Sequence, residues 1–253
     1  MSTAPAGAEP NVAALSVHDL RAGYGPVTVL RGVNLTVAPG QVVALLGANG
    51  AGKTTLLRTV SGALRATGGS VRLGGTDMTR ARASERSRRG LCLIPEGRGI
   101  FRTLSVEENL RLNSPPWIKP VRLDPAYEMF PVLAERRKQA AGTLSGGQQQ
   151  MLALSRAFLS GASVVLVDEV SVGLAPVIVD AIFGALRVLA GQGKSLLLVE
   201  QYIQRALGMA DTVYIMKRGE LTLAGSPADL DEREIMAEYI GQQADSLRPG
   251  EFR

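Results

Sequence analysis

Features of secreted, membrane-spanning and redox-active proteins are largely missing from this sequence. It contains one cysteine, Cys92, within the apolar run Leu91–Ile94, where we expect a buried side chain rather than a reactive thiol. No apolar run approaches the roughly 20 residues that a membrane-spanning helix needs. Residues 1–14 lack a basic head and an apolar signal core. We therefore predict a disordered lead-in over residues 1–14 and a cytoplasmic protein.

Aromatic side chains are missing where nucleic acid binding would need them. The net charge is +5, but the excess is mostly arginine dispersed along the chain. The densest basic stretch, residues 80–89, contains no aromatic residue and includes Glu85. Proteins bind single-stranded nucleic acid largely by stacking its bases on aromatic side chains. We therefore interpret this stretch as solvated surface and expect no nucleic acid partner.

The apolar and turn-forming residues indicate one α/β domain with an antiparallel layer at its start. The chain is 45% hydrophobic, enough to bury a substantial core. Residues 15–43 are strand-like, with turns at 23–26 and 38–40, which favours an antiparallel hairpin layer. Residues 42–46 then form a continuous apolar strand, and a helix is expected from Lys53 to about Ser61.

The rest of the chain predicts a helical lobe followed by a return to alternating strands and helices. Residues 105–161 have helical patterns, with capping-box spacing at Ser105 and Glu108 and a break at Pro115. Beyond this lobe we predict strands at 164–167, 196–199 and 213–216, with helices between them, the first beginning at Pro176. Such alternation is typical of a parallel sheet covered by helices.

Residues 47–54 fit the pattern GxxxxGK[ST] between the predicted strand and helix. The glycines allow the backbone to wrap a phosphate with its N–H groups pointing inward, and the helix N-terminus adds partial positive charge. Lys53 is expected to reach the β and γ phosphates, and Thr54 to ligate Mg²⁺. A dinucleotide fingerprint is excluded because Lys53, Thr54 and Thr55 follow Gly52, so its third glycine is missing.

Two adjacent acids, Asp168 and Glu169, follow the apolar strand at 164–167. Ligands bind at this edge of parallel sheets, and two acids there need a cation. We expect Asp168 to hold Mg²⁺ and Glu169 to orient an attacking water in line with the γ phosphate. The alternative, that either acid merely caps the next helix, is weakened because Pro176 lies too far downstream.

A second glycine-bearing loop, residues 144–148, opens the helix that carries Met151, Leu154 and Phe158 on one face. Its helix N-terminus could also attract an anion. Ser145 as a simple helix cap is the alternative, and for an isolated Ser-Gly-Gly sequence it would be the better one.

Taken in order, residues 47–55, 144–148 and 164–169 resemble the motifs of the nucleotide-binding subunit of ABC transporters. The resemblance runs from about residue 15 to 241. It implies an α/β fold: a P-loop NTPase parallel-sheet core with an N-terminal antiparallel β layer and a smaller α-helical lobe over roughly 105–161. Residues 242–253 are expected to form a flexible tail.

The resemblance implies a Mg²⁺-dependent ATPase in which two subunits pair head to tail. Residues 145–147 of one subunit would close over ATP held by the other, Tyr24 would stack on adenine, and residues 171–174 would cross the interface. A turn or core tyrosine is the alternative for Tyr24. The residues expected to contact nucleotide are Tyr24, Gly47, Ala48, Asn49, Gly50, Ala51, Gly52, Lys53, Thr54, Thr55, Leu144, Ser145, Gly146, Gly147 and Gln148.

Two further positions resemble one branch of the family, the ATPase subunits of branched-chain (hydrophobic) amino acid importers. Glu96 stands where most relatives have glutamine, and Gln201 where most have histidine. Glu96 is expected to ligate Mg²⁺ or its water, with a solvated loop acid as the alternative. Gln201 is expected to donate to the γ phosphate and assist Lys53 and Glu169 in catalysis, with an ordinary helix-start residue as the alternative. Val170 replaces the proline usual after the catalytic acid.

This branch implies a subunit on the cytoplasmic face of the membrane. Its direct partners would be integral membrane permease subunits and a second ATPase subunit, and a heterodimer is favoured over a homodimer. A periplasmic or lipid-anchored solute-binding protein would be an indirect partner. An importer for urea or short amides is the near alternative. A soluble ABC protein acting on DNA or ribosomes is less favoured, because residues 55–144 leave no room for a long coiled coil and the chain has one motif set.

Overall fold

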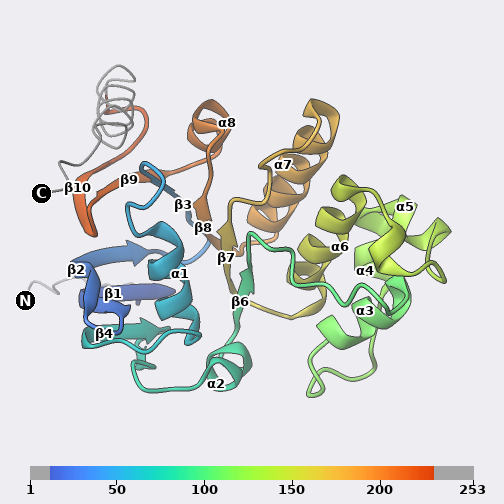
Figure 1. Cartoon of the computed structure of the whole chain (residues 1–253), viewed down its shortest axis with the longest axis horizontal. Helices are drawn as coiled ribbons and strands as arrows, with labels where there is room; N and C mark the ends of the chain where they lie inside the picture. The colour runs from blue at the N-terminus through green and yellow to red at the C-terminus, as the bar shows by residue number, and fades with distance from the viewer. Residues whose placement is uncertain (1–11, 231–253) are drawn as a thin grey trace, which may run out of the picture.

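The computed structural model describes residues 12–230. Most of the predicted lead-in, the last part of the predicted domain from 231 to 241, and the predicted tail over 242–253 therefore lie outside the described residues. The described chain forms two β-sheets, with strand orders β2-β1-β4-β5 and β10-β9-β3-β8-β7-β6, and a group of helices to one side (Figure 1).

The smaller sheet is antiparallel and contains the predicted hairpin. Strands β1 (Leu15–Tyr24) and β2 (Val27–Val37) pair around a two-residue turn. Strand β4 (Gly68–Leu73) pairs with β1 on its other side and carries the short β5 (Thr76–Asp77). Buried residues alternate with exposed ones along β1, as expected for a sheet with one solvated face. The layer is confirmed, but the sequence did not predict β4 and β5.

The larger sheet contains the predicted parallel core. Strands β3 (Val42–Leu46), β7 (Val164–Asp168) and β8 (Ser195–Val199) are buried at every residue, as central strands covered on both faces must be. Strand β6 (Leu91–Ile94) runs parallel to β7, and β9 (Thr212–Lys217) runs parallel to β3. Strand β10 (Glu220–Gly225) pairs antiparallel with β9 at the edge of the sheet. The carboxyl ends of β3, β7 and β8 therefore meet at one edge of the sheet.

Helices cover both faces of the larger sheet. Helix α1 (Lys53–Ser61) packs Leu56, Leu57 and Val60 in a core shared with the antiparallel layer. Helix α7 (Pro176–Gly191) packs Ile182 and Leu186 in a second core with β7 and β8. The short helices α2 (Ala83–Arg88) and α8 (Ile203–Leu207) flank the sheet. The bounds predicted for α1 and the start predicted for α7 are confirmed.

The helical lobe lies beside this core on the right of Figure 1. It consists of α3 (Val106–Asn113), α4 (Asp124–Met129), α5 (Pro131–Glu135), the 3₁₀ turn η1 (Ala141–Thr143) and α6 (Gly146–Leu159). Helix α6 is the centre of the lobe, and its Phe158 packs edge-to-face on Phe130 with ring centroids 6.3 Å apart. The predicted capping box at Ser105 and Glu108 is present.

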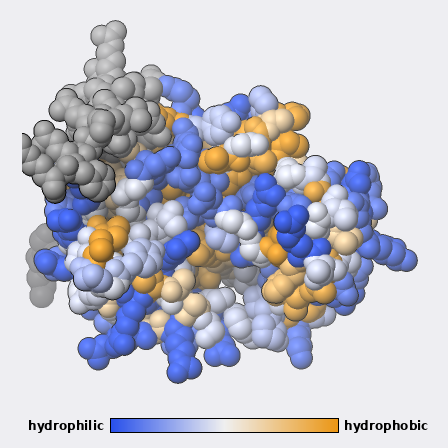
Figure 2. Space-filling model, viewed as in Figure 1, coloured by the Kyte–Doolittle hydropathy of each residue, from blue (hydrophilic) through white to orange (hydrophobic). Residues whose placement is uncertain are grey.

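The surface that faces the viewer in Figure 2 is mainly hydrophilic, with hydrophobic residues gathered over α7. The exposed residues of this helix include Val177 and Val188. Among residues 12–230, none of the helices combines the length and the apolar character needed to cross a bilayer.

Candidate functional site

A hollow of about 690 Å³ lies where α1 begins and the strands β7 and β8 end. It gathers residues from five separate parts of the chain, including the phosphate loop, Glu169 and Gln201, but not Asp168. The residues that line it are Val29, Asn49, Gly50, Gly52, Lys53, Thr54, Thr55, Glu96, Glu169, Val172 and Gln201. Most of these are residues that the sequence assigned to nucleotide, metal or catalysis.

The loop between β3 and α1 has a backbone path that only glycine permits at its first position. Gly47 has φ 153°, and a Cβ built on it would lie 2.3 Å from the main-chain oxygen of Met216. Gly52 has φ 113° and precedes α1 without any side-chain cap. The N–H groups of the first turn of α1 are therefore free of side-chain acceptors, as an anion-binding helix N-terminus requires.

Lys53 is folded back over this loop. Its side chain is 5% exposed, and Nζ donates to the main-chain oxygens of Gly47 at 2.7 Å and Ala48 at 3.0 Å. The same ammonium lies 3.6 Å from Oε1 of Glu169. Burial lowers the pKa of Lys53 from its ordinary value, although the charge of Glu169 opposes this effect. A buried cation thus lies at the base of the hollow.

Thr54 and Asp168 join the loop to the end of β7. Thr54 Oγ1 donates to Asp168 Oδ1 at 3.1 Å. The pKa of Asp168 is raised to about 6, mainly by burial; the Thr54 hydrogen bond opposes this increase, and the charges of Glu169 and Glu96 add to it. The acids at this edge repel one another, so a cation among them would lower the free energy of the ionised set.

These groups fit Mg²⁺ only as part of a shared coordination shell. Within the described part of the chain, no group of three or more His, Cys, Asp or Glu side chains is arranged to hold a metal ion alone. Thr54, Asp168 and Glu96 offer oxygen ligands, which Mg²⁺ prefers, and this ion commonly takes its remaining ligands from water and substrate phosphates. The residues present therefore fit a metal that arrives with a triphosphate.

Glu169 is held by contacts on both sides. Gln201 Nε2 donates to Glu169 Oε2 at 2.8 Å, opposite the ammonium of Lys53, and the main-chain N–H of Glu169 donates to Val199 at 2.8 Å. Glu169 has φ 47°, in the left-handed region that a non-glycine residue adopts only when its surroundings enforce it. Gln201 was expected to donate to the γ phosphate, whereas here its amide donates to Glu169.

The second predicted loop does not join this hollow. Ser145 Oγ accepts from the Gln148 main-chain N–H, and the Gln148 side chain accepts from the Ser145 N–H in return, so Ser145 is the helix cap that was the alternative. Of the described residues, those that line the hollow include none from 144–148 and not Tyr24. Tyr24 is 45% exposed at the end of β1.

Two kinds of residue near the site were missed by sequence reasoning. Val29 and Val172 provide apolar lining, and nothing in their local pattern indicates it. Glu200 is 1% exposed and accepts a hydrogen bond from Ser171. Glu200 could have been noticed as a candidate site residue because it is an acid directly after the apolar strand β8. The local sequence around Ser171 gives no comparable indication.

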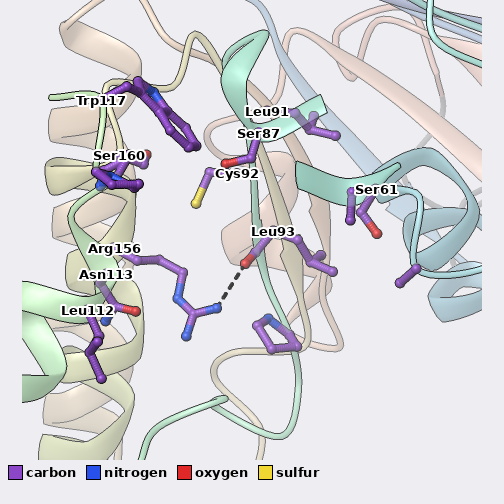
Figure 3. Close-up of a pocket in the computed structure, with 15 residues that line it drawn as sticks. Ser61, Ser87, Leu91, Cys92, Leu93, Leu112, Asn113, Trp117, Arg156 and Ser160 are labelled. Carbon is purple, nitrogen blue, oxygen red and sulfur yellow. Dashed lines mark hydrogen bonds between the residues drawn. The ribbon is translucent and has the colours of Figure 1, made fainter. Parts of the chain in front are cut away.

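A second hollow, of about 420 Å³, lies where β6 meets α3 and α6 (Figure 3). Trp117 and Leu112 are among its partly exposed residues. Arg156 points across it and donates to the main-chain oxygens of Leu93 at 3.3 Å and Gly99 at 2.7 Å. The Arg156 guanidinium is therefore already hydrogen-bonded to main-chain carbonyls. The phosphate loop, Glu96 and Glu169 do not line this hollow, so it is separate from the candidate site.

Comparison with known proteins agrees with this arrangement. The family model described as ABC transporter matches residues 30–172. The chain is 41% identical to the high-affinity branched-chain amino acid transport ATP-binding protein BraG of Pseudomonas aeruginosa, with 90% of this chain and 99% of that protein covered. It is 35% identical to a probable branched-chain amino acid transport ATP-binding protein, LivF, of Archaeoglobus fulgidus, with 85% and 93% covered.

Solved structures show the same fold. A nucleotide-free ATP-binding cassette from an ABC transporter superposes with a TM-score of 0.78 at 25% identity, covering 94% of this chain and all of that one. Another ABC transporter cassette, in its ADP conformation, gives 0.76 at 26% identity and covers 94% and 99%. The predicted P-loop NTPase core is thus confirmed, and the chain belongs to the ABC transporter family as a nucleotide-binding, ATP-hydrolysing subunit coupled to transport.

Proposed function

We propose that this chain hydrolyses MgATP at the hollow between α1 and the ends of β7 and β8, with Glu169 as the group that orients the attacking water. The observation that carries this proposal is the position of the Glu169 carboxylate, with Lys53 Nζ 3.6 Å from one oxygen and Gln201 Nε2 2.8 Å from the other. A carboxylate fixed on two sides at the mouth of a phosphate loop can accept a hydrogen bond from water without reorganising.

The phosphate loop supplies the binding half of this function. The triphosphate would lie against the uncapped N-terminus of α1, and the ammonium of Lys53 would exchange its bonds to the Gly47 and Ala48 carbonyls for phosphate oxygens. Thr54, Asp168 and Glu96 would hold Mg²⁺, which supplies charge neutralisation when bound. Gln201 would keep Glu169 oriented and, after a small rotation, reach the γ phosphate with the same amide.

The helical lobe would complete the site of a second subunit. Helix α6 has 14 residues and begins at Gly146, with the exposed Ser145 as its cap. We propose that this N-terminus faces the ATP of the partner in a head-to-tail dimer, because it does not line the hollow of its own chain. Tyr24 would then contact adenine at the rim of the hollow.

For transport, we propose an importer of branched-chain amino acids. Two relatives that match almost this whole chain are described as branched-chain amino acid transport ATP-binding proteins. Glu96 and Gln201, the two positions that resemble this branch, both line the hollow. The subunit would act at the cytoplasmic face of the membrane with permease subunits, a sister ATPase and, indirectly, a solute-binding protein.

The catalytic assignment is tested with purified full-length protein. Glu169→Gln is expected to lower kcat about a thousandfold while ATP affinity stays within about threefold, because an amide cannot accept the water proton. ATP should also drive this variant into a dimer measurable by light scattering. The control is Glu220→Gln, at an exposed acid on the edge strand β10. Turnover by Glu169→Gln at the wild-type rate would contradict the assignment.

The solute is tested by reconstitution. The chain, its sister ATPase and the permease encoded beside it are placed in proteoliposomes with the solute-binding protein, and ATP-dependent uptake of leucine, urea and acetamide is measured. Uptake of leucine alone supports the proposal. Uptake of urea or acetamide with no leucine uptake overturns it in favour of an amide importer.

A further inference from the structure

A buried acid, Glu200, lies directly behind the catalytic edge without reaching the hollow. It follows β8 and precedes Gln201, and it is 1% exposed. Its Oε2 accepts a hydrogen bond from the hydroxyl of Ser171, a fully buried residue two positions after Glu169. These partners are 29 residues apart in the chain, so the contact ties the segment after β7 to the segment after β8.

The Ser171–Glu200 contact lies just beyond the paired ends of β7 and β8. These strands are in register, with Asp168 opposite Val199, and the main-chain N–H of Glu169 donates to the Val199 oxygen at 2.8 Å. The contact between the Ser171 hydroxyl and the Glu200 carboxyl joins the same two segments further along. One main-chain and one side-chain hydrogen bond therefore connect the backbone around Glu169 to the end of β8.

Fold stability alone does not account for an acid at this position. The pKa of Glu200 is raised to about 7, mainly by burial and in part by the charge of Glu169. Its Oε1 is buried and has no hydrogen-bond partner. A buried carboxylate that uses half of its acceptor capacity destabilises a fold relative to a neutral group of the same shape.

We propose that Glu200 and Ser171 form a positioning pair that holds the backbone of residues 169–171 so that the Glu169 carboxylate stays between Lys53 and Gln201. The proposal rests on the catalytic role proposed for Glu169. The left-handed φ of Glu169, 47°, needs enforcement by neighbouring contacts. Neither Ser171 nor Glu200 is among the described residues that line the hollow, so the pair would act on Glu169 through the backbone.

The test compares kcat with KM for ATP in full-length variants. Ser171→Ala and Glu200→Gln are each expected to lower kcat about tenfold while KM changes less than about twofold, since a small displacement of a catalytic group slows the chemical step more than it weakens binding. The double variant should be no slower than the slower single variant, because both changes act on the same contact. Ser171→Thr, which keeps the hydroxyl, should restore most of the rate.

Thermal unfolding separates positioning from simple support of the fold. Glu200→Gln is expected to raise Tm at pH 8 while lowering kcat, because it removes an ionised buried group. The control is Ser195→Ala, at the other end of β8, where a buried serine hydroxyl donates to Ala38 at 3.1 Å. Its kcat should equal that of the wild type.

Two results would overturn the inference. One is a kcat within twofold of the wild type for both Ser171→Ala and Glu200→Gln; the other is a loss of kcat that parallels a loss of folded protein. Glu169→Gln, measured beside them, distinguishes the levels of failure. If it is inactive while the pair variants are normal, the pair alone is rejected. If it turns over normally, the catalytic assignment and the pair are rejected together.

Discussion

The loops that open α1 and α6 are similar in composition but differ in how their helix N-termini are satisfied. Gly52 precedes α1 with no side-chain cap, whereas Ser145 and Gln148 cap α6 reciprocally. In the first loop no side chain caps the helix, and Lys53 Nζ donates to the loop carbonyls of Gly47 and Ala48. In the second loop the Ser145 hydroxyl accepts from the Gln148 N–H. A glycine-rich helix start therefore binds anions within one chain only when no side chain competes for its donors.

The largest expected difference between the loops comes from substituting a glycine in each. Gly47→Ala would force a Cβ to 2.3 Å from the Met216 main-chain oxygen at a φ of 153°. We expect the unfolding free energy to fall by about 4 kcal/mol and ATP binding to be lost. At Gly146 the nearest atom is the end of the Arg98 side chain, at 3.2 Å, so Gly146→Ala should fold normally. Urea unfolding and calorimetry measure both. Equal losses would remove the distinction between the loops.

The pH dependence of stability should come from the strand ends behind the first loop. The pKa of Glu200 is about 7, above its ordinary value of 4.5, so the folded state holds this proton more tightly than the unfolded state. The stabilisation that comes from the protonated Glu200 is complete below about pH 4.5 and is lost as the pH rises through 7. The total loss in unfolding free energy is about 3 kcal/mol. Glu200→Gln should reduce this slope in urea unfolding between pH 5 and 8. An unchanged slope would contradict the burial argument.

Removing the cation of the first loop should weaken binding without damaging the fold. Lys53→Ala is expected to lower the affinity for a nonhydrolysable ATP analogue about a hundredfold, through loss of one or two charge-assisted hydrogen bonds. Lys194→Ala is a matched control, since Lys194 also donates to a main-chain oxygen, that of Ala162 at 2.6 Å, away from the hollow. Calorimetric titration that gave the same affinity for Lys53→Ala and the wild type would rule out this role.

The smallest effect is expected at the cap of the second loop. Ser145→Ala should lower the unfolding free energy by about 1 kcal/mol, because the Gln148 N–H loses its acceptor. Its monomer should bind ATP as the wild type does, while ATP-dependent dimerisation weakens. Sedimentation with and without ATP measures this. Reduced ATP affinity in the monomer would show that the second loop acts within its own chain.

Sequence patterns were sufficient for features that depend on neighbours along the chain. The bounds of α1, the start of α7 at Pro176 and the cap at Ser105 follow from glycine, proline and capping residues within a few positions. The parallel core was predictable for the same reason, because all-apolar strands alternate with helices. The phosphate loop, Asp168 and Glu169 could be named as candidates because their motifs are local.

Contacts between distant segments were not predictable. The hydrogen bond from the Gln201 amide to Glu169, 32 positions away, has no signal in the local sequence. The attachment of β4 and β5 to the antiparallel layer depends on strand register across more than 40 residues. The roles of Tyr24, Glu96 and residues 144–148 toward nucleotide stay predictions, because they concern contacts with a ligand or a second subunit.

The bonds from Lys53 to the Gly47 and Ala48 carbonyls have a consequence for turnover. Before a phosphate arrives, the ammonium donates to these two carbonyl oxygens, which would otherwise need other donors. Binding then replaces one set of oxygens by another, so its net free energy is a difference between two strong interactions. A site that works by exchange holds its substrate moderately and lets the product leave. An ATPase that turns over repeatedly needs fast exchange of ADP for ATP at this loop more than it needs maximal ATP affinity.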